Sequence, residues 1–196
     1  DGTKLAAVHY GGNIWTSEDS GASWSEVTTT GATKNWQKIT SSADGTKLAA
    51  VVYQGSIYTS SDSGAHWTER LAGNRFWKGI TSSADGTKLV AVVNGGSIWT
   101  SDNSGATWTE VTTTEVNLAW YGITSSADGT KLAAVDYGGN VWTKVDATFY
   151  ASGTECHVLY TSAPAGYELI LNGNNFTQHE QRACGLGTYS ALTDAS

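Results

Sequence analysis

One recurring stretch constrains what this chain can fold into. The sequence Ser-Ser-Ala-Asp-Gly-Thr-Lys-Leu-Ala-Ala-Val occupies residues 41–51, returns almost unchanged at residues 82–92 and 125–135, and its second half forms residues 1–8. The aspartates of the four copies are 43, 41 and 43 residues apart. This period is typical of repeat proteins, in which each small unit buries its apolar face against its neighbours. The sequence therefore predicts an array of four similar units.

The second unit shows how one repeat is expected to fold. Residues 35–41 alternate apolar and polar side chains, as a half-buried strand does. Residues 47–53 form a nearly continuous apolar run, as expected of a strand buried on both faces. Two more short strands are expected at residues 56–59 and 68–71, and no helical periodicity is present. Four short strands in about 42 residues are typical of one propeller blade, so we predict an all-β fold, a β-propeller of four-stranded antiparallel blades.

The turn between the third and fourth strands carries a motif. Residues 17–24 and 60–67 fit Ser-x-Asp-x-Gly-x-x-Trp, and residues 101–108 fit it with Asn in place of Asp. The motif resembles the Asp-box, or BNR, repeat of sialidase-type β-propellers. In such a turn Asp or Asn accepts backbone N–H bonds, Gly adopts a positive φ and Trp packs into the blade. The structural residues implied are Ser17, Asp19, Gly21, Trp24, Ser60, Asp62, Gly64, Trp67, Ser101, Asn103, Gly105 and Trp108.

The fourth unit departs from this pattern. Residues 144–150 keep an aspartate in register but lack the Ser, Gly and Trp of the motif. We therefore expect propeller repeats over residues 1–148 and terminal strands or a capping hairpin over residues 149–181. Four units are few for such a propeller, and three arrangements fit. The chain is part of a larger propeller, it closes on itself through a C-terminal strand, or its open edge pairs with another copy and forms a polymer.

Residues 182–196 contain a second resemblance. The sequence Cys-Gly-Leu-Gly-Thr-Tyr-Ser at residues 184–190 resembles the start of the ephrin-receptor-like cysteine-rich module. The resemblance implies an extracellular protein that continues into a disulfide-rich stalk, as in large surface proteins of algae and protists, including those of flagellar hairs (mastigonemes). Cys156 and Cys184 are then expected in disulfides, with each other or with a cysteine beyond Ser196. Asn175 begins the single N-glycosylation sequon.

Sialidase activity requires residues that this chain lacks. The family resemblance would carry an arginine triad and an Arg-Ile-Pro motif. The arginines of the chain are Arg70, Arg75 and Arg182. They do not supply the catalytic set, and the carboxylates that recur in the turns suit structural roles, because a catalytic residue is needed once. Other Asp-box glycosidases use a carboxylate pair from separate blades, and that alternative stays open. We predict no catalytic residue.

Composition narrows the partners. A net charge of −7 with three arginines argues against nucleic acid, whose phosphates need a basic surface. No apolar run has the roughly 18 residues of a membrane span, so direct membrane insertion is not expected. We predict no cofactor and no metal site, because the histidines lack metal-ligand spacing. The histidines are His9, His66, His157 and His179.

Positions that differ between units are the candidates for a specific function. The turn between the second and third strands and the links between units, at residues 28–35, 72–75 and 112–118, should open on the face opposite the Asp-box turns. We call this surface the loop face. Its candidate glycan-binding residues are His9, Tyr10, Tyr53, Gln54, Arg75, Asn94, Asp136 and Tyr137. Exposed aromatic and amide side chains there can stack on and hydrogen-bond a sugar.

Three functions follow from these observations. The first is a non-catalytic extracellular structural or adhesion module of a cell-surface appendage, matrix or filament, which associates with itself or with other structural proteins. The second is a carbohydrate-binding, lectin-like propeller. The third is a fragment of a glycoside hydrolase.

Overall fold

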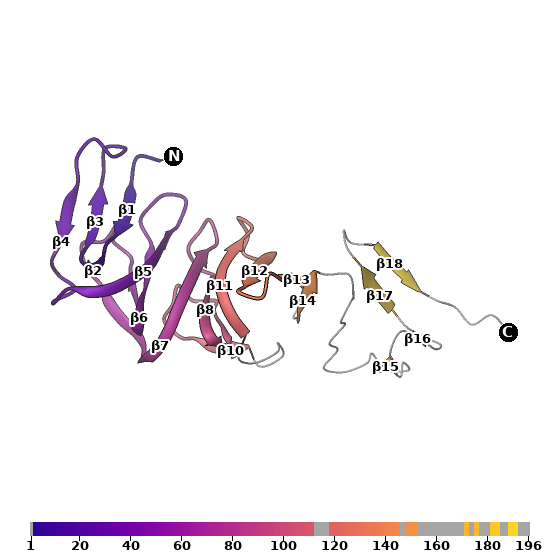
Figure 1. Ribbon diagram of the computed structural model, residues 1–196. Coiled ribbons are helices and arrows are strands. Elements are labelled where there is room, and N and C mark those ends of the chain that lie inside the picture. Colours follow the sequence, from indigo (N-terminus) through magenta and orange to yellow (C-terminus); the bar gives the residue numbers. More distant parts are fainter. Residues whose placement is uncertain are drawn as a thin grey trace.

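The computed structural model describes residues 2–111, 118–145, 148–152, 171–172, 175–176, 181–184 and 188–191 of the chain. Every regular element in these ranges is a β-strand. None of the described residues belongs to a helix with the length and apolarity of a membrane span. The units follow one another side by side in chain order, from the indigo strands of the first unit to the orange strands of the fourth (Figure 1).

The first unit is a small antiparallel sheet joined to the second by one short strand. Its sheet contains β1 (Leu5–Val8), β3 (Ile14–Ser17) and β4 (Ser25–Val27), in the order β1-β3-β4. The short strand β2 (Tyr10–Gly12) pairs with β5 (Lys34–Ser41), the first strand of the second unit. Each unit is thus connected to the next through the turn between its second and third strands.

The other units form an 11-stranded sheet, in which β2 takes part. Its further strands are β5, β6 (Leu48–Ser60), β7 (Thr68–Ser82), β8 (Leu89–Gly96), β9 (Ile98–Ser101), β10 (Thr109–Val111), β11 (Leu118–Ser125), β12 (Leu132–Asp136), β13 (Val141–Val145) and β14 (Thr148–Ser152). Their order is β14-β13-β12-β11-β8-β7-β6-β5-β2, with β9 and β10 branching from β8. Two separate hairpins follow, β15 (Leu171–Asn172) with β16 (Asn175–Phe176) and β17 (Gln181–Cys184) with β18 (Thr188–Ala191).

The link between the second and third units is not a loop, although the sequence predicts a variable link at residues 72–75. Strand β7 runs from Thr68 to Ser82 without interruption. The reason is pairing across the unit boundary, because Arg75 lies opposite Gly55 of β6 and continues the ladder. Gly73, with a φ of 148°, provides the bend at this point. Residues 112–117 of the later link lie outside the described residues.

The hydrophobic core lies in layers between adjacent units. Between the third and fourth units, Val92 and Ile98 pack against a group that includes Trp120 and Trp142. Equivalent layers lie between the first and second units and between the second and third. In the two inner units every residue of the second strand, from Leu48 to Val52 and from Leu89 to Val93, is buried, as the apolar runs predict. No residue of the second strand is buried in the first unit, and in the fourth unit Leu132, Ala134 and Asp136 are buried but Val135 is exposed.

The most repeated sequence of the chain forms a second turn, which makes hydrogen bonds to the next unit. The backbone N–H of Ala43 donates to the carbonyl oxygen of Ala84 over 2.7 Å. Nζ of Lys47 donates to the carbonyl oxygen of Asp85 over 2.9 Å. The same two contacts recur one unit further along the chain. This turn therefore has a structural role in holding the units together.

The aspartate of this turn caps it. In the second unit, Asp44 accepts hydrogen bonds from Ser42 Oγ (2.6 Å) and from the backbone N–H of Thr46 (3.0 Å). These bonds, that of Ser42 first, lower the pKa of Asp44 from 3.8 to about 2. The pKa values of the equivalent Asp85 and Asp128 are lowered for the same reason. Each carboxylate accepts hydrogen bonds from its own turn and so stabilises it.

Candidate functional site

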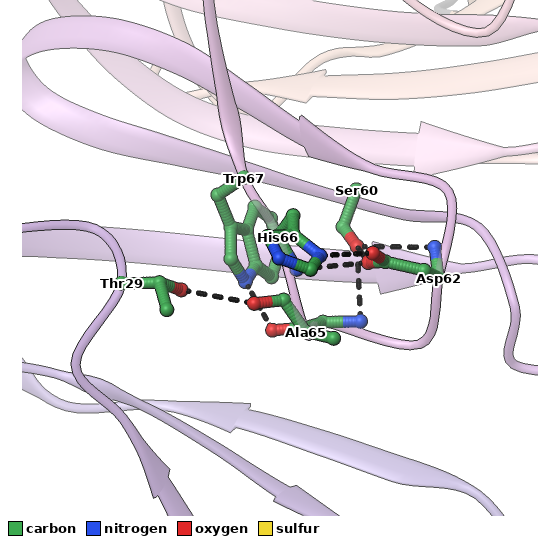
Figure 2. Close-up of polar contacts among 7 residues, drawn as sticks. Thr29, Ser60, Asp62, Ala65, His66 and Trp67 are labelled. Atoms are coloured by element: carbon green, nitrogen blue, oxygen red, sulfur yellow. Dashed lines mark hydrogen bonds and ion pairs between the residues drawn. The ribbon is translucent and has the colours of Figure 1, made fainter.

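The turn that carries the Ser-x-Asp-x-Gly-x-x-Trp motif in the second unit, here called the motif turn, lies between β6 and β7 and is held by side-chain hydrogen bonds (Figure 2). Ser60 Oγ donates to Asp62 Oδ1 over 2.8 Å and accepts the backbone N–H of Gly64 over 2.9 Å. Asp62 Oδ1 also accepts the backbone N–H of His66 over 2.9 Å, and Asp62 Oδ2 lies 2.6 Å from His66 Nδ1. The side chains of this turn thus satisfy backbone groups that no strand pairs with.

The turns of the first and third units contain the same backbone contacts. They are Gly21 N–H to Ser17 Oγ (2.9 Å), Ser23 N–H to Asp19 Oδ1 (2.8 Å), Gly105 N–H to Ser101 Oγ (2.9 Å) and Thr107 N–H to Asn103 Oδ1 (2.9 Å). The amide oxygen of Asn103 accepts the same backbone N–H as the carboxylates do, so an uncharged oxygen can also cap this turn.

The glycine of the turn lies tightly against the preceding unit. Gly64 has a φ of 93°, and a Cβ at this position would lie 2.9 Å from Thr16 Cγ2 of the first unit. Thr29 Oγ1 donates to the carbonyl oxygen of Ala65 over 3.2 Å and adds a second contact across the boundary (Figure 2). Trp67 Nε1 donates to the carbonyl oxygen of Gly64 over 2.9 Å. The turn thus packs tightly between two units, and we call this arrangement a wedge.

Not every Trp of the motif is equally packed. The ring of Trp67 lies 6.4 Å from that of Trp36, and Nε1 of Trp108 donates to the carbonyl oxygen of Gly105 over 3.1 Å. Trp24, in the first unit, is 41% exposed. The described part of the first unit contains no counterpart of Trp36, which explains why Trp24 is less covered.

The carboxylates of these turns are suited to capping. Hydrogen bonds, chiefly from Ser23, lower the pKa of Asp19 from 3.8 to about 2, and those from His66 do the same for Asp62. A general acid at neutral pH needs a raised pKa. In addition, Glu69 accepts a hydrogen bond from Ser56 Oγ over 2.5 Å. The repeated acids are therefore parts of the framework.

The loop face brings several aromatic and cationic side chains together. The rings of Tyr53 and Phe76 lie 5.4 Å apart, and Nζ of Lys78 lies 5.1 Å from the Tyr53 ring. In the fourth unit the rings of Tyr121 and Tyr137 lie 5.7 Å apart, and Tyr137 is 76% exposed. These groups offer flat apolar surfaces to a ligand.

The remaining candidates of the loop face are placed differently. Arg75 stacks on Trp99, with Cζ 4.5 Å from the ring centroid. Asp136 is buried, because its carboxylate accepts hydrogen bonds from Trp142 Nε1 (2.8 Å) and from the backbone N–H of Asn140 (3.1 Å). It caps its own turn and does not face a ligand. The other predicted residues are His9, Tyr10 and Gln54, which are exposed, and Asn94, which is half buried.

Sequence reasoning missed Phe76, Lys78 and Tyr121. Lys78 and Tyr121 each follow a buried tryptophan directly and lie where the register of the ladder shifts. A β-bulge at this point re-aims a side chain. Their position, one residue after the tryptophan of the first strand, is the signal that would have identified Lys78 and Tyr121.

A cavity of about 830 Å³ lies between the third and fourth units, on the face of the motif turns. Strand β13 ends at Val145 and β14 begins at Thr148, so the connection is much shorter than the motif of the other units. We call this space the fourth-unit cavity. Its lining residues are Lys88, Asp102, Thr124, Ser125, Ser126, Gly129, Thr130, Lys131, Leu132, Ala133, Thr143 and Lys144. The sequence showed the loss of the motif, but not the space that the loss leaves.

Several predictions concern the end of the chain. Strand β14 begins at residue 148, the last residue of the predicted repeat region, and pairs with β13. Cys156 lies outside the described residues, Cys184 ends β17 and Asn175 begins β16. The disulfide, the glycosylation and the cysteine-rich module stay predictions. Over the described ranges no group of three or more His, Cys, Asp or Glu could hold a metal ion.

No protein-family model and no curated protein sequence matches the chain. Solved structures do. The GH74 xyloglucanase from Xanthomonas campestris matches with a TM-score of 0.61 and 15% identity, over 79% of this chain and 29% of that chain. A structure of YCF48 bound to D1 peptide matches with a TM-score of 0.53 and 12% identity, over 63% and 41%. The nidogen/laminin complex matches with a TM-score of 0.59 and 17% identity, over 76% and 58%.

These similarities show the fold. The similar structures are β-propellers, so the predicted fold class is confirmed and the chain forms part of a propeller. The chain spans between 29% and 58% of the lengths of those three structures. They include a glycoside hydrolase and complexes with a peptide or a protein. The shared fold therefore does not decide between an enzyme and a binding protein.

Proposed function

We propose that this chain is a non-catalytic structural or adhesion module that joins propeller units of separate copies end to end in an extracellular assembly. The observation that carries the proposal is an apolar face of the fourth unit that no other described part of the chain covers. Val92 and Ile98 of the third unit are fully buried under the fourth unit. Their counterparts in the fourth unit, Val135 and Val141, are 37% and 41% exposed. We call this surface the tail face.

The first unit has a surface of complementary character. In the fourth unit, Leu132 and Trp142 are buried against the third unit. Their counterparts in the first unit, Leu5 and Trp15, are 38% and 36% exposed. We call this surface the head face. Within the chain, each contact between units joins a tail-type surface to a head-type surface, so the head face of a second copy fits the tail face.

Polar groups also support a second copy of the chain as the partner of the tail face. Lys47 and Lys88 each donate to a carbonyl oxygen of the following unit. Lys131 is their counterpart in the fourth unit, it is exposed, and its ammonium group makes no hydrogen bond or ion pair with another described residue. The first unit of a second copy would supply the carbonyl oxygen. There is open space at Gly2 of the first unit, where nothing lies within 4 Å of the place that a Cβ would occupy.

Such an interface joins two different surfaces, so it produces a closed ring or a growing filament. Burial of the exposed parts of Val135 and Val141 would contribute on the order of 1 kcal/mol each. Two similar propellers, in the nidogen/laminin complex and in YCF48 with its peptide, are found with protein or peptide partners. The resemblance of residues 184–190 to a cysteine-rich module supports an extracellular location.

The test is the mass of the 196-residue chain in solution, measured by light scattering and sedimentation over a range of concentrations. We expect oligomers that grow with concentration. The double variant Val135→Asp with Val141→Asp should stay monomeric, because two charges would be buried unpaired. Tyr137→Asp adds a charge at an exposed position of the loop face and should assemble normally.

A monomer at every concentration would contradict the proposal. Oligomers that persist in the double variant would place the contact elsewhere and would overturn the tail face as the interface. Circular dichroism of each variant establishes that the fold is retained, which we expect because Val135 and Val141 are both partly exposed.

A carbohydrate-binding function is the second candidate, and the Tyr121–Tyr137 pair on the loop face favours it. Exposed rings stack on the apolar faces of sugars. A glycan array with the chain and with Tyr137→Ala tests it. Specific binding that the variant loses would support the lectin-like function, whereas no binding, or equal binding by the variant, would remove it.

The glycoside hydrolase fragment remains the third hypothesis. Hydrolysis by such an enzyme needs two opposed carboxylates, one of them protonated. Asp19 and Asp62 are engaged in caps that keep them ionised. Turnover of a polysaccharide that one carboxylate substitution abolishes would establish an enzyme.

A further inference from the structure

We infer that the fourth-unit cavity binds a sugar acid, a saccharide that carries a carboxylate. This inference goes beyond the proposed assembly, because it concerns a small ligand and a cavity that shares only Lys131 with the proposed contact between copies. The cavity exists because the fourth unit lacks the turn that fills the same place in other units. In the second and third units the glycine of that turn lies close to a leucine. A Cβ added at Gly64 would lie 3.3 Å from Leu48 Cδ1, and a Cβ added at Gly105 would lie 3.2 Å from Leu89 Cδ1. In the fourth unit, Leu132 lines the cavity.

The charge of the cavity is opposite to that of the chain. Three lysines and one aspartate, Asp102, are the charged lining residues, whereas the whole chain has a net charge of −7. Lys144 stands where the other units have the buried serine of the motif. The ammonium groups of Lys131 and Lys144 make no hydrogen bond or ion pair with another described residue. Two ammonium groups are thus available for an anion at a concave surface, where water screens their charge less than on an open one.

The rest of the lining suits a sugar better than a bare ion. Ala133, which is half buried, supplies an apolar surface for the C–H face of a ring, whereas Leu132 is only 4% exposed and contributes little. Thr124 and Thr143 line the cavity with hydroxyl groups that have no hydrogen-bond partner in the described part of the chain. The volume of about 830 Å³ lies in the range of small-molecule sites. A carboxylate near Lys144, with ring hydroxyls near the threonines, uses each of these groups.

Calorimetry at low ionic strength tests the inference, with the trisaccharide of galacturonic acid as the probe and the neutral trisaccharide of galactose beside it. We expect saturable binding of the acidic sugar only, weakened by added salt. The variant Lys144→Ser should bind at least about tenfold more weakly, because a hydrogen bond to a charged group is lost. Serine occupies the equivalent position in the other units, so the variant should fold. Lys38→Ser removes the same charge from an exposed position of β5, outside the cavity and the loop face, and should leave the affinity unchanged.

Three results would overturn the inference. They are no saturable binding of the acidic trisaccharide, equal binding by Lys144→Ser, and equal affinity for the neutral trisaccharide. Inorganic sulfate that competes with the same affinity as the sugar would reduce the site to an anion site and would contradict recognition of the sugar. Lys144→Gln, which keeps most of the side-chain length, repeats the test if the serine variant fails to fold. Assembly through the tail face is measured separately with Val135 and Val141, so either proposal can fail without the other.

Discussion

The indole N–H of Trp77 donates a hydrogen bond to the carbonyl oxygen of Gly55 over 3.0 Å, which ties the first strand of the third unit to a turn of the second. Trp36 has the same place in the second unit and is equally buried, with exposed fractions of 1% for Trp36 and 0% for Trp77. Its indole N–H, however, has no hydrogen-bond partner in the described part of the chain. The repeat thus holds a matched pair of tryptophans that differ in one hydrogen bond.

Replacing each of these tryptophans with phenylalanine should separate packing from hydrogen bonding. Trp77→Phe and Trp36→Phe remove similar buried volume, but only the first leaves the Gly55 carbonyl without its donor. We expect Trp77→Phe to lower the free energy of unfolding by about 1 kcal/mol more than Trp36→Phe. Urea denaturation of the two variants measures the difference. Equal losses would mean that this bond contributes nothing to joining the units.

The tight packing of the motif turn between two units predicts how much stability a methyl group at Gly64 would cost. Gly64 and Gly95 both have positive φ, 93° and 68°. An added Cβ at Gly64 would lie 2.9 Å from Thr16 Cγ2, whereas nothing lies within 4 Å at Gly95. Alanine in this backbone region costs about 1–2 kcal/mol at either position. Gly64→Ala should cost at least about 1 kcal/mol more, because the clash pushes two units apart. Similar midpoints in thermal unfolding for the two variants would contradict a tight wedge.

The caps of this molecule follow from its sequence, and the contacts between its units do not. Ser60, Asp62 and Gly64 lie within five residues of one another, so their hydrogen bonds are fixed by local turn chemistry. The pairing of Arg75 with Gly55 depends on how one unit is placed against the next, and no local pattern encodes that placement. Residues 72–75, which the sequence predicts as a variable link, are therefore part of strand β7.

The candidate site shows the same division. Tyr53 and Tyr137 could be identified as variable residues of the loop face from the frame of the repeat. Asp136 could not be separated from them, because its burial depends on a bond to Trp142, six residues away on the next strand. The fourth-unit cavity depends on a missing turn and on Lys88 of the preceding unit. A space of this kind becomes visible only when neighbouring units are placed together.

The presence of Asn103 in the third turn predicts the effect of changing Asp62. Asp62→Asn keeps an oxygen that can accept the backbone N–H of His66, as Asn103 accepts that of Thr107. Asp62→Ala removes the acceptor and leaves the backbone N–H of His66 without a cap. At neutral pH we expect thermal unfolding midpoints in the order wild type, then Asp62→Asn, then Asp62→Ala, with the alanine variant a few degrees below the wild type. An alanine variant as stable as the asparagine variant would show that the cap is dispensable.

The same carboxylates predict how stability depends on pH. Hydrogen bonds lower the pKa of Asp19, Asp44 and Asp62 from 3.8 to about 2 in the folded chain. A lowered pKa stabilises the fold above 3.8, where these groups are ionised in both states, and this stabilisation is lost as the pH falls from 3.8 towards 2. We therefore expect little change in urea midpoint between pH 7 and 5 and a steep fall below pH 4. Asp62→Asn removes one titrating group, so its midpoint should fall less steeply over that interval. A variant with the same slope as the wild type would show that the Asp62 cap is not coupled to folding.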